Sequence, residues 1–98
     1  MQDQKGKVME RIESKTGKVF YLKSLDKGFE VVRENGSTAK VTDSLLRRTQ
    51  SRLLDKEEIP FRKISYTVAI ELAVLHILRD VIEIDQVNKV YRLKIYTL

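Results

Sequence analysis

Residues 66–80 read YTVAIELAVLHILRD, the longest apolar run in the chain. On a helix, its apolar side chains occupy nearly the whole circumference, and Thr67, Glu71 and His76 are the few polar interruptions before the charged end. A helix that is hydrophobic on all sides is buried in a core, an oligomer or a membrane. The run is too short and too often interrupted for the ~20 apolar residues of a membrane span. We therefore expect a central helix at about residues 66–80, on which the rest of the chain packs.

A second helix is expected at about residues 43–56, and it is amphipathic. The polar residues at positions 42–44 can each cap its first turn, because a side-chain oxygen accepts from free backbone N–H groups. The apolar side of this helix is expected to consist of Leu45, Leu46, Thr49 and Leu53. Pro60 lacks a backbone donor and disfavours helix before it, so residues 56–60 should end the helix. In the connector that follows, we expect Phe61 and Ile64 to point inward.

The N-terminal half has the composition of an antiparallel sheet. Runs rich in β-branched and aromatic residues occupy positions 18–23, 29–34 and 37–42, separated by turns that contain glycine. The pair Asn35-Gly36 predicts a two-residue type I′ turn, in which both central residues have positive φ. We expect a meander of three strands, or of four if residues 7–13 also form a strand.

After residue 80 the apolar period changes from helical to alternating. Ile82 and Ile84 alternate with acids, and Tyr91, Leu93 and Ile95 alternate with polar residues beyond a turn at positions 86–88. The sequence therefore predicts a C-terminal β-hairpin at about residues 82–97. Strands and helices that segregate in this way indicate the α+β class. The length suits one domain, residues 1–98, with residues 1–5 as a frayed tail.

The C-terminal order of helix and hairpin has a family resemblance. Residues 73–95, AVLHILRDVIEIDQVNKVYRLKI, are similar to the end of a winged-helix domain, in which a helix precedes a two-stranded wing ending in a Tyr-x-Leu strand. The resemblance covers about the last third of the chain and implies DNA binding. One feature departs from it: Thr67, Glu71 and His76 do not form the polar face that a recognition helix presents to DNA.

The charge balance favours an anionic partner. Lys and Arg number 19 against 14 acids, which gives a net charge of +5 on 98 residues. An excess of positive charge at this size makes nucleic acid a plausible partner. There is no cysteine, so disulfides and thiolate metal sites are excluded. The N-terminal residues MQDQKGK contain no apolar segment of a signal peptide, and we expect a cytoplasmic protein without a membrane segment.

Residues that carry catalytic chemistry are scarce. The single histidine, His76, falls within the apolar helix, where a core or interface position is expected. One histidine without cysteine does not build a typical zinc site, and the four glycines are too scattered for a phosphate-binding loop. Acids at positions 80, 83 and 85 suggest a cation site, but alternating acids on the solvent face of a strand are the simpler interpretation. We expect no enzyme, no cofactor, no metal site and no small-molecule substrate.

The basic residues divide into two groups. Guanidinium groups bind phosphates and can read guanine. The residues expected to contact nucleic acid are those of the amphipathic helix and connector, and those of the hairpin: Arg47, Arg48, Arg52, Arg62, Lys63, Lys89, Arg92 and Lys94.

Two functions follow from these features. The first is a small non-enzymatic nucleic-acid-binding module, with DNA as the expected ligand, such as a regulator or a mobile-element accessory protein. The alternative is a homodimeric assembly or adaptor protein that uses the central helix or a sheet edge as its interface. A homodimer is expected in either case, because one small sheet and one amphipathic helix do not easily cover an apolar helix on all sides.

Overall fold

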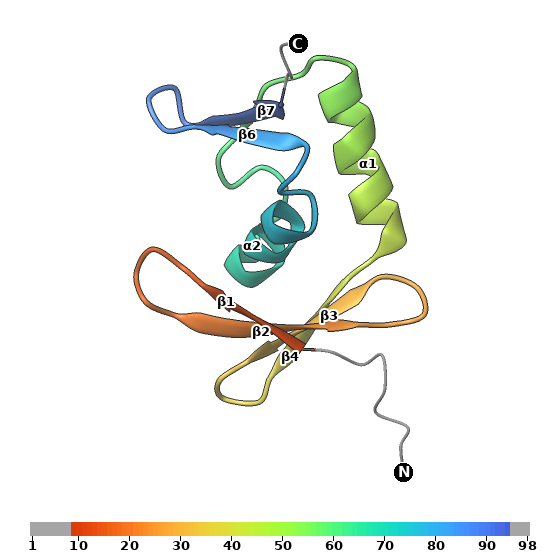
Figure 1. The fold of residues 1–98 in the computed structure, drawn as a ribbon, viewed down its shortest axis with the longest axis vertical. Coiled ribbons are helices and arrows are strands. Elements are labelled where there is room, and N and C mark those ends of the chain that lie inside the picture. Colours follow the sequence, from red (N-terminus) through yellow and green to blue (C-terminus); the bar gives the residue numbers. More distant parts are fainter. Residues whose placement is uncertain (1–8, 95–98) are drawn as a thin grey trace.

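The computed structural model describes residues 9–94, which form two antiparallel sheets and two helices (Figure 1). The N-terminal sheet has four strands in sequential order: β1 (Met9–Glu13), β2 (Val19–Ser24), β3 (Phe29–Arg33) and β4 (Thr38–Val41). The C-terminal sheet has the order β5-β7-β6, formed by β5 (Ile59–Pro60), β6 (Ile82–Asp85) and β7 (Val90–Leu93). The helices are α1 (Asp43–Leu54) and α2 (Val68–Ile77). The predicted α+β class is confirmed, and the meander has four strands.

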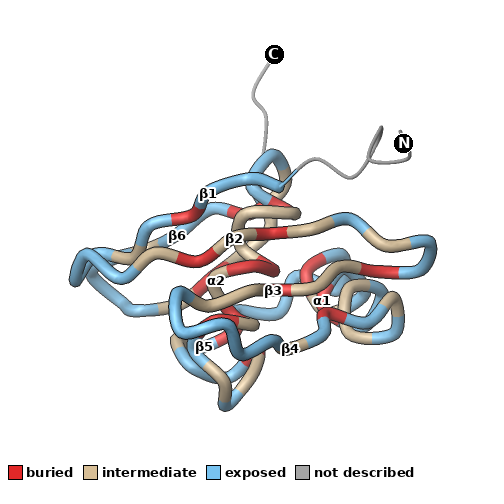
Figure 2. The backbone as a smooth tube through the Cα atoms, turned by 90° about the horizontal axis from the view of Figure 1, so that it is seen from below, coloured by how far each residue is buried: buried red, intermediate tan, exposed pale blue. Residues whose placement is uncertain are grey.

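Helix α2 is the middle layer of the molecule. It lies between the two sheets, and α1 runs along one side of this stack (Figure 1). Among the described elements, α2 contacts β1, β3 and β4 of the N-terminal sheet. Ala69 and Ala73 are buried on one stripe of the helix, where their small side chains permit close approach of the neighbouring elements. Figure 2 shows buried positions on the strands and on α2. Along β2, the buried residues Phe20 and Leu22 alternate with partly exposed ones.

The central helix is shorter than predicted. It covers residues 68–77 rather than 66–80, with Thr67 as its N-cap and Leu78 as its C-cap. The chain turns directly after it, since the backbone N–H groups of Val81 and Ile82 both bond to the carbonyl of Leu78. The two sheets cover part of its hydrophobic circumference, whereas Val68 on the same helix is 42% exposed. The second sheet adds cover beyond the one sheet and one helix that were expected, and the homodimer stays a prediction.

The turn between β3 and β4 differs from the predicted type I′ turn. Gly36 has a φ of 89°, but Asn35 is not among the described residues with positive φ. The backbone N–H of Gly36 donates to the Arg33 carbonyl. The backbone N–H of Ser37 donates to the side chain of Asn35. Arg33 and Ser37 close a three-residue loop, in which only the glycine needs the left-handed conformation. The position of the hairpin was right and its turn type was wrong.

Strand β5 was not predicted. Its two residues pair with β7, with Ile59 opposite Tyr91, and Ile59 has no exposed surface. Two residues are too few to give an alternating pattern, so the sequence could suggest only a break there. The inward positions of the connector are confirmed: Phe61 stacks on Tyr91 with ring centroids 4.8 Å apart, and Ile64 is 8% exposed.

The C-terminal hairpin is confirmed for β6 and β7. Asp85 closes the turn between them by accepting hydrogen bonds from the N–H groups of Val87 and Asn88. Residues 95–97 of the predicted hairpin and residues 1–5 of the predicted tail lie outside the described residues. Within residues 9–94, no helix has both the length and the apolar character to cross a membrane.

Helix α1 provides a test of the packing. Leu53 is 1% exposed, whereas its neighbour Leu54 is 66% exposed. Leu53→Ala should lower the free energy of unfolding by about 2–5 kcal/mol, because it removes buried methyl groups and leaves a cavity. Leu54→Ala should change it by less than about 0.5 kcal/mol. Urea unfolding of both variants measures the difference, and equal losses would contradict this packing of α1.

Candidate nucleic-acid interface

The candidate site is organised by a buried carboxylate on α2. Glu71 is 3% exposed, and both of its oxygens accept hydrogen bonds. Oε1 accepts from the backbone N–H groups of Ile64 at 3.1 Å and Ser65 at 3.3 Å. Oε2 accepts from the N–H of Arg62 at 2.8 Å and from the hydroxyl of Tyr91 at 2.7 Å. Burial of a charge is costly unless it is well hydrogen-bonded, and these four donors meet that requirement.

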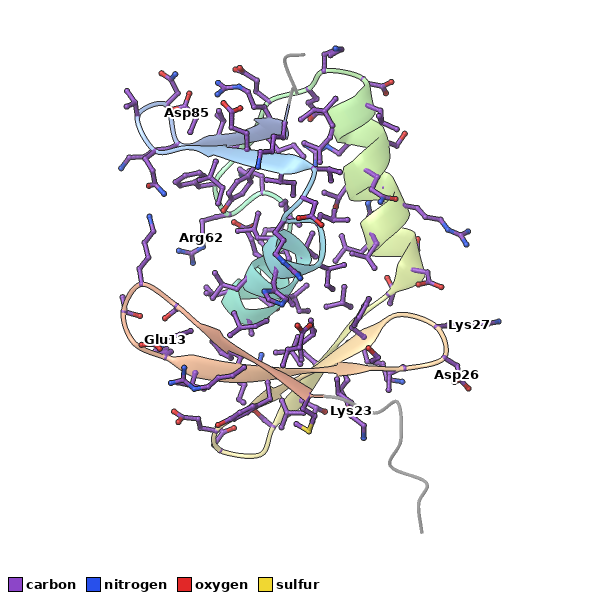
Figure 3. All side chains as sticks on the ribbon, in the orientation of Figure 1. Glu13, Lys23, Asp26, Lys27, Arg62 and Asp85 are labelled. Carbon is purple, nitrogen blue, oxygen red and sulfur yellow. The ribbon has the colours of Figure 1, made fainter. Side chains whose placement is uncertain are left out.

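The same bonds fix the connector between β5 and α2. Arg62 has a φ of 71°, a left-handed conformation that is uncommon for a residue with a side chain. Such a conformation costs on the order of 1 kcal/mol and persists only where the surroundings impose it. Here the bond from the Arg62 N–H to Glu71 imposes it. Figure 3 shows the Arg62 side chain pointing away from α2, between the β1–β2 turn and the β6–β7 hairpin.

The hydroxyl of Tyr91 donates a hydrogen bond to Glu71, and its surroundings keep it protonated. Burial raises the pKa of Tyr91 well above its ordinary value of 10.0, and the hydrogen bond to the Glu71 carboxylate raises it further. Both effects disfavour loss of the phenolic proton. The hydroxyl therefore stays protonated at neutral pH and joins β7 to α2.

Three hollows surround the N-terminal end of α2. The first, of about 580 Å³, is bounded by the turns of the N-terminal sheet and the start of α2. The second, of about 380 Å³, lies between α1, the connector and α2. The third, of about 450 Å³, lies between the β1–β2 turn, α2 and the C-terminal sheet. The third shares Thr16 and Val68 with the first and Arg62 with the second, so it adjoins both of them, and we treat the lining of the three hollows as one surface.

This surface is strongly basic. Its hollows are lined by two acids, Glu34 and Glu71, and Glu71 is buried with its bonds filled. We call the surface the basic face and define it by six cations and one aromatic residue: Lys15, Lys18, Arg33, Arg48, Arg62, Lys63 and Tyr66. The cations come from the N-terminal sheet, from α1 and from the connector. They are far apart in sequence, and the fold brings them to the hollows around the start of α2.

Three of the eight predicted residues lie on this face. Arg48, Arg62 and Lys63 line the second hollow together, and all three are exposed. Within residues 9–94, the structure gives their side chains no ion pair, so their charges are open to an external anion. Arg47 is also exposed, but it lines none of these hollows.

Two further predicted residues are engaged within the chain. Arg52 donates through Nε to Glu57 at 3.0 Å, and this bond raises the pKa of Arg52 and lowers that of Glu57. Arg92 has carboxylate partners in Glu58, Glu83 and Asp85, with the closest N–O distances at 2.9 Å.

Glu83 and Asp85, the acids of the hairpin, therefore neutralise the positive charge of Arg92. The pKa of Asp85 is lowered, first by hydrogen bonds from Asn88 and then by Arg92. Lys89, in the β6–β7 turn, and Lys94 are exposed, and neither lines the hollows around α2. The hairpin contributes less free positive charge than its sequence suggested.

Four residues of the basic face were missed by sequence reasoning. Lys15, Lys18 and Arg33 belong to β-hairpins, and no local pattern shows that two hairpin turns approach the start of α2. Tyr66 was assigned to the central helix, but it precedes the helix and is 96% exposed. In the sequence, the one signal for this part of the face was the position of Tyr66 shortly after Arg62 and Lys63.

His76 lies outside the basic face. Its Nε2 is 3.3 Å from Oε1 of Glu10 on β1, and its side chain is 24% exposed. This contact joins α2 to the edge strand of the N-terminal sheet, in keeping with the expected packing position.

Comparisons with protein-family models, with curated proteins and with solved structures find no match for this chain. Its function is therefore inferred from the geometry of the site.

The Glu71 network gives a direct test. Glu71→Gln keeps the shape of the side chain but places an NH₂ group against backbone donors, leaving at least one of them without an acceptor. The variant should lose about 1–3 kcal/mol of unfolding free energy for each donor so affected. Tyr91→Phe removes one donor and leaves the carboxylate with three, so its loss should be smaller. Urea unfolding ranks the two, and a Glu71→Gln variant as stable as the parent would contradict the role given to the carboxylate.

Proposed function

We propose that the chain is a non-enzymatic nucleic-acid-binding module whose phosphate contacts come from the basic face. The observation that carries the proposal is the convergence of six cations on the hollows around the start of α2, against one acid that is not buried in the Glu71 network. A surface of this kind attracts a polyanion over a distance and neutralises several phosphates on contact. A cytoplasmic location belongs to the same proposal.

The distribution of the cations favours an extended ligand. Arg48 and Lys63 flank the second hollow, and Lys18 and Arg33 flank the first, on the other side of the α2 N-terminus. A small anion would occupy one hollow and leave the others unused. A nucleic-acid backbone presents phosphates in series, so it can contact both groups at once.

The alternative is an assembly or adaptor protein that acts as a homodimer. The third hollow favours it, because Leu72, Leu75 and Phe61 line it and its rim includes Val68, 42% exposed, and Ile84, 45% exposed. Among the described strands, β6 is at an edge of the C-terminal sheet. An apolar hollow beside a sheet edge suits a protein partner. Since Val68, Leu72 and Leu75 belong to α2, the interface in this alternative is the part of the central helix that lines the hollow, together with the β6 edge.

Charge removal separates the two functions. Arg62→Gln with Lys63→Gln should weaken binding to nucleic acid of any sequence. The slope of log affinity against log salt should shrink by about 1.4–1.8, which corresponds to two lost phosphate contacts. Fluorescence anisotropy with labelled DNA and RNA, measured over a series of salt concentrations, provides both values.

The matched control removes the same number of positive charges from another part of the surface. Lys23 and Lys27 lie on the side of the N-terminal sheet remote from Arg62 in Figure 3. Lys23→Gln with Lys27→Gln should leave affinity and slope close to those of the parent. Equal losses in both double variants would mean that total charge, and not the basic face, is responsible. If the parent binds no nucleic acid at low salt, the proposal fails, and a dimer in sedimentation would favour the assembly function.

A further inference from the structure

The basic face contains an exposed aromatic ring that packing does not explain. Tyr66 is 96% exposed, more than any other large hydrophobic residue in the described part of the chain. A ring in that position gives up the free energy that burial would supply. It stands next to Arg62 and Lys63 in the lining of the second hollow. The combination of an aromatic face with cations is the arrangement by which proteins bind unpaired bases.

The backbone on both sides of Tyr66 is fixed. The N–H of Ser65 bonds to Glu71 at 3.3 Å, and the N–H of Thr67 bonds to the hydroxyl of Ser65 at 3.1 Å. Helix α2 begins directly after Thr67. The ring is therefore held on an ordered support, which lowers the entropy lost when a base stacks on it.

The second hollow has a lining that suits a base. Apolar side chains of Leu45, Ile64 and Ile70 contribute to it, while Arg48 and Lys63 supply positive charge. Its volume of about 380 Å³ lies within the range of small-ligand sites. An unstacked base can bury its faces against the apolar lining and Tyr66, with its phosphates near the cations.

The architecture disfavours a duplex at the same time. In the winged-helix arrangement that the C-terminal third resembles, the helix before the wing enters a groove of DNA. Here α2 is covered by the N-terminal sheet on one side and is bonded through Glu71 to Tyr91 on the other. The wing offers little free charge, because Arg92 is bound to acids. The part of α2 that remains accessible, at Val68, Leu72 and Leu75, is apolar and lacks the polar side chains with which a recognition helix reads a groove.

We infer that the ligand of the basic face is single-stranded nucleic acid, with Tyr66 stacking on a base and Arg48, Arg62 and Lys63 contacting the adjacent phosphates. This inference rests on the proposed function and specifies its ligand class. It predicts little dependence on sequence, because every base has a face on which an aromatic ring can stack.

The test uses labelled oligonucleotides of roughly 12 nucleotides, a length within the site sizes of single-strand binding proteins. Single-stranded DNA, RNA of the same sequence and the DNA duplex are compared at one salt concentration. The parent should bind the single strands more tightly than the duplex. Tyr66→Ala should weaken single-strand binding by about 5- to 150-fold, the effect of losing one stacked base, without changing the salt slope. Tyr66→Phe, which keeps the ring, should bind as the parent does.

The outcomes separate this inference from the proposed function. If Tyr66→Ala binds single strands as the parent does while Arg62→Gln with Lys63→Gln weakens binding, the nucleic-acid function stands and the stacking role is overturned. If the parent prefers the duplex, the ligand class is overturned. If the parent binds neither form, both proposals fail. Thermal unfolding of Tyr66→Ala should match the parent, since the ring is exposed, and this control excludes loss of fold as the cause.

Discussion

The arrangement of this molecule depends on one carboxylate. Glu71 belongs to the middle helix, and its oxygens bond to the backbone of the connector and to Tyr91 of β7. A buried charge with these partners permits little variation in how they are placed, because each lost bond leaves a buried polar group unpaired. The left-handed conformation of Arg62 and the position of the backbone directly before Tyr66 follow from that constraint. One interaction within the core therefore fixes the part of the basic face that the connector supplies.

The position of α2 explains both the fold and its functional consequence. An apolar helix without a polar side needs cover, and the chain supplies much of it with a sheet above and a sheet below (Figure 1). The helix therefore lacks the exposed polar side with which a recognition helix reads DNA. The N-terminal end of α2 is the part that remains accessible, and the cations from three parts of the chain meet there. The resemblance to a winged-helix C-terminus thus concerns the order of the elements, and the proposed function assigns the ligand to the N-terminal end of α2 instead.

The sequence predicted the fold better than the site. Periodicity and turn residues located both helices, three strands of the meander and the C-terminal hairpin, because those elements bury one face or all faces in a regular pattern. The first strand of the meander was left open. Sequence reasoning missed β5, which is too short for a pattern, and the partners of Glu71, which depend on a connector folding back. It predicted Arg48, Arg62 and Lys63 from local charge. It did not place Lys18 or Arg33 with them, since their proximity depends on how the N-terminal sheet packs against α2.

The measurement that tests the central claim most directly is a titration of the ¹⁵N-labelled chain with a single-stranded oligonucleotide, followed by amide chemical shifts. If Glu71 organises a face that binds nucleic acid, shifts should concentrate at residues 15–18 and 62–67 and at Arg33 and Arg48. Amides at residues 23–27 and 85–92 should move little. Shifts centred on those two segments, or no shifts at low salt, would contradict the account.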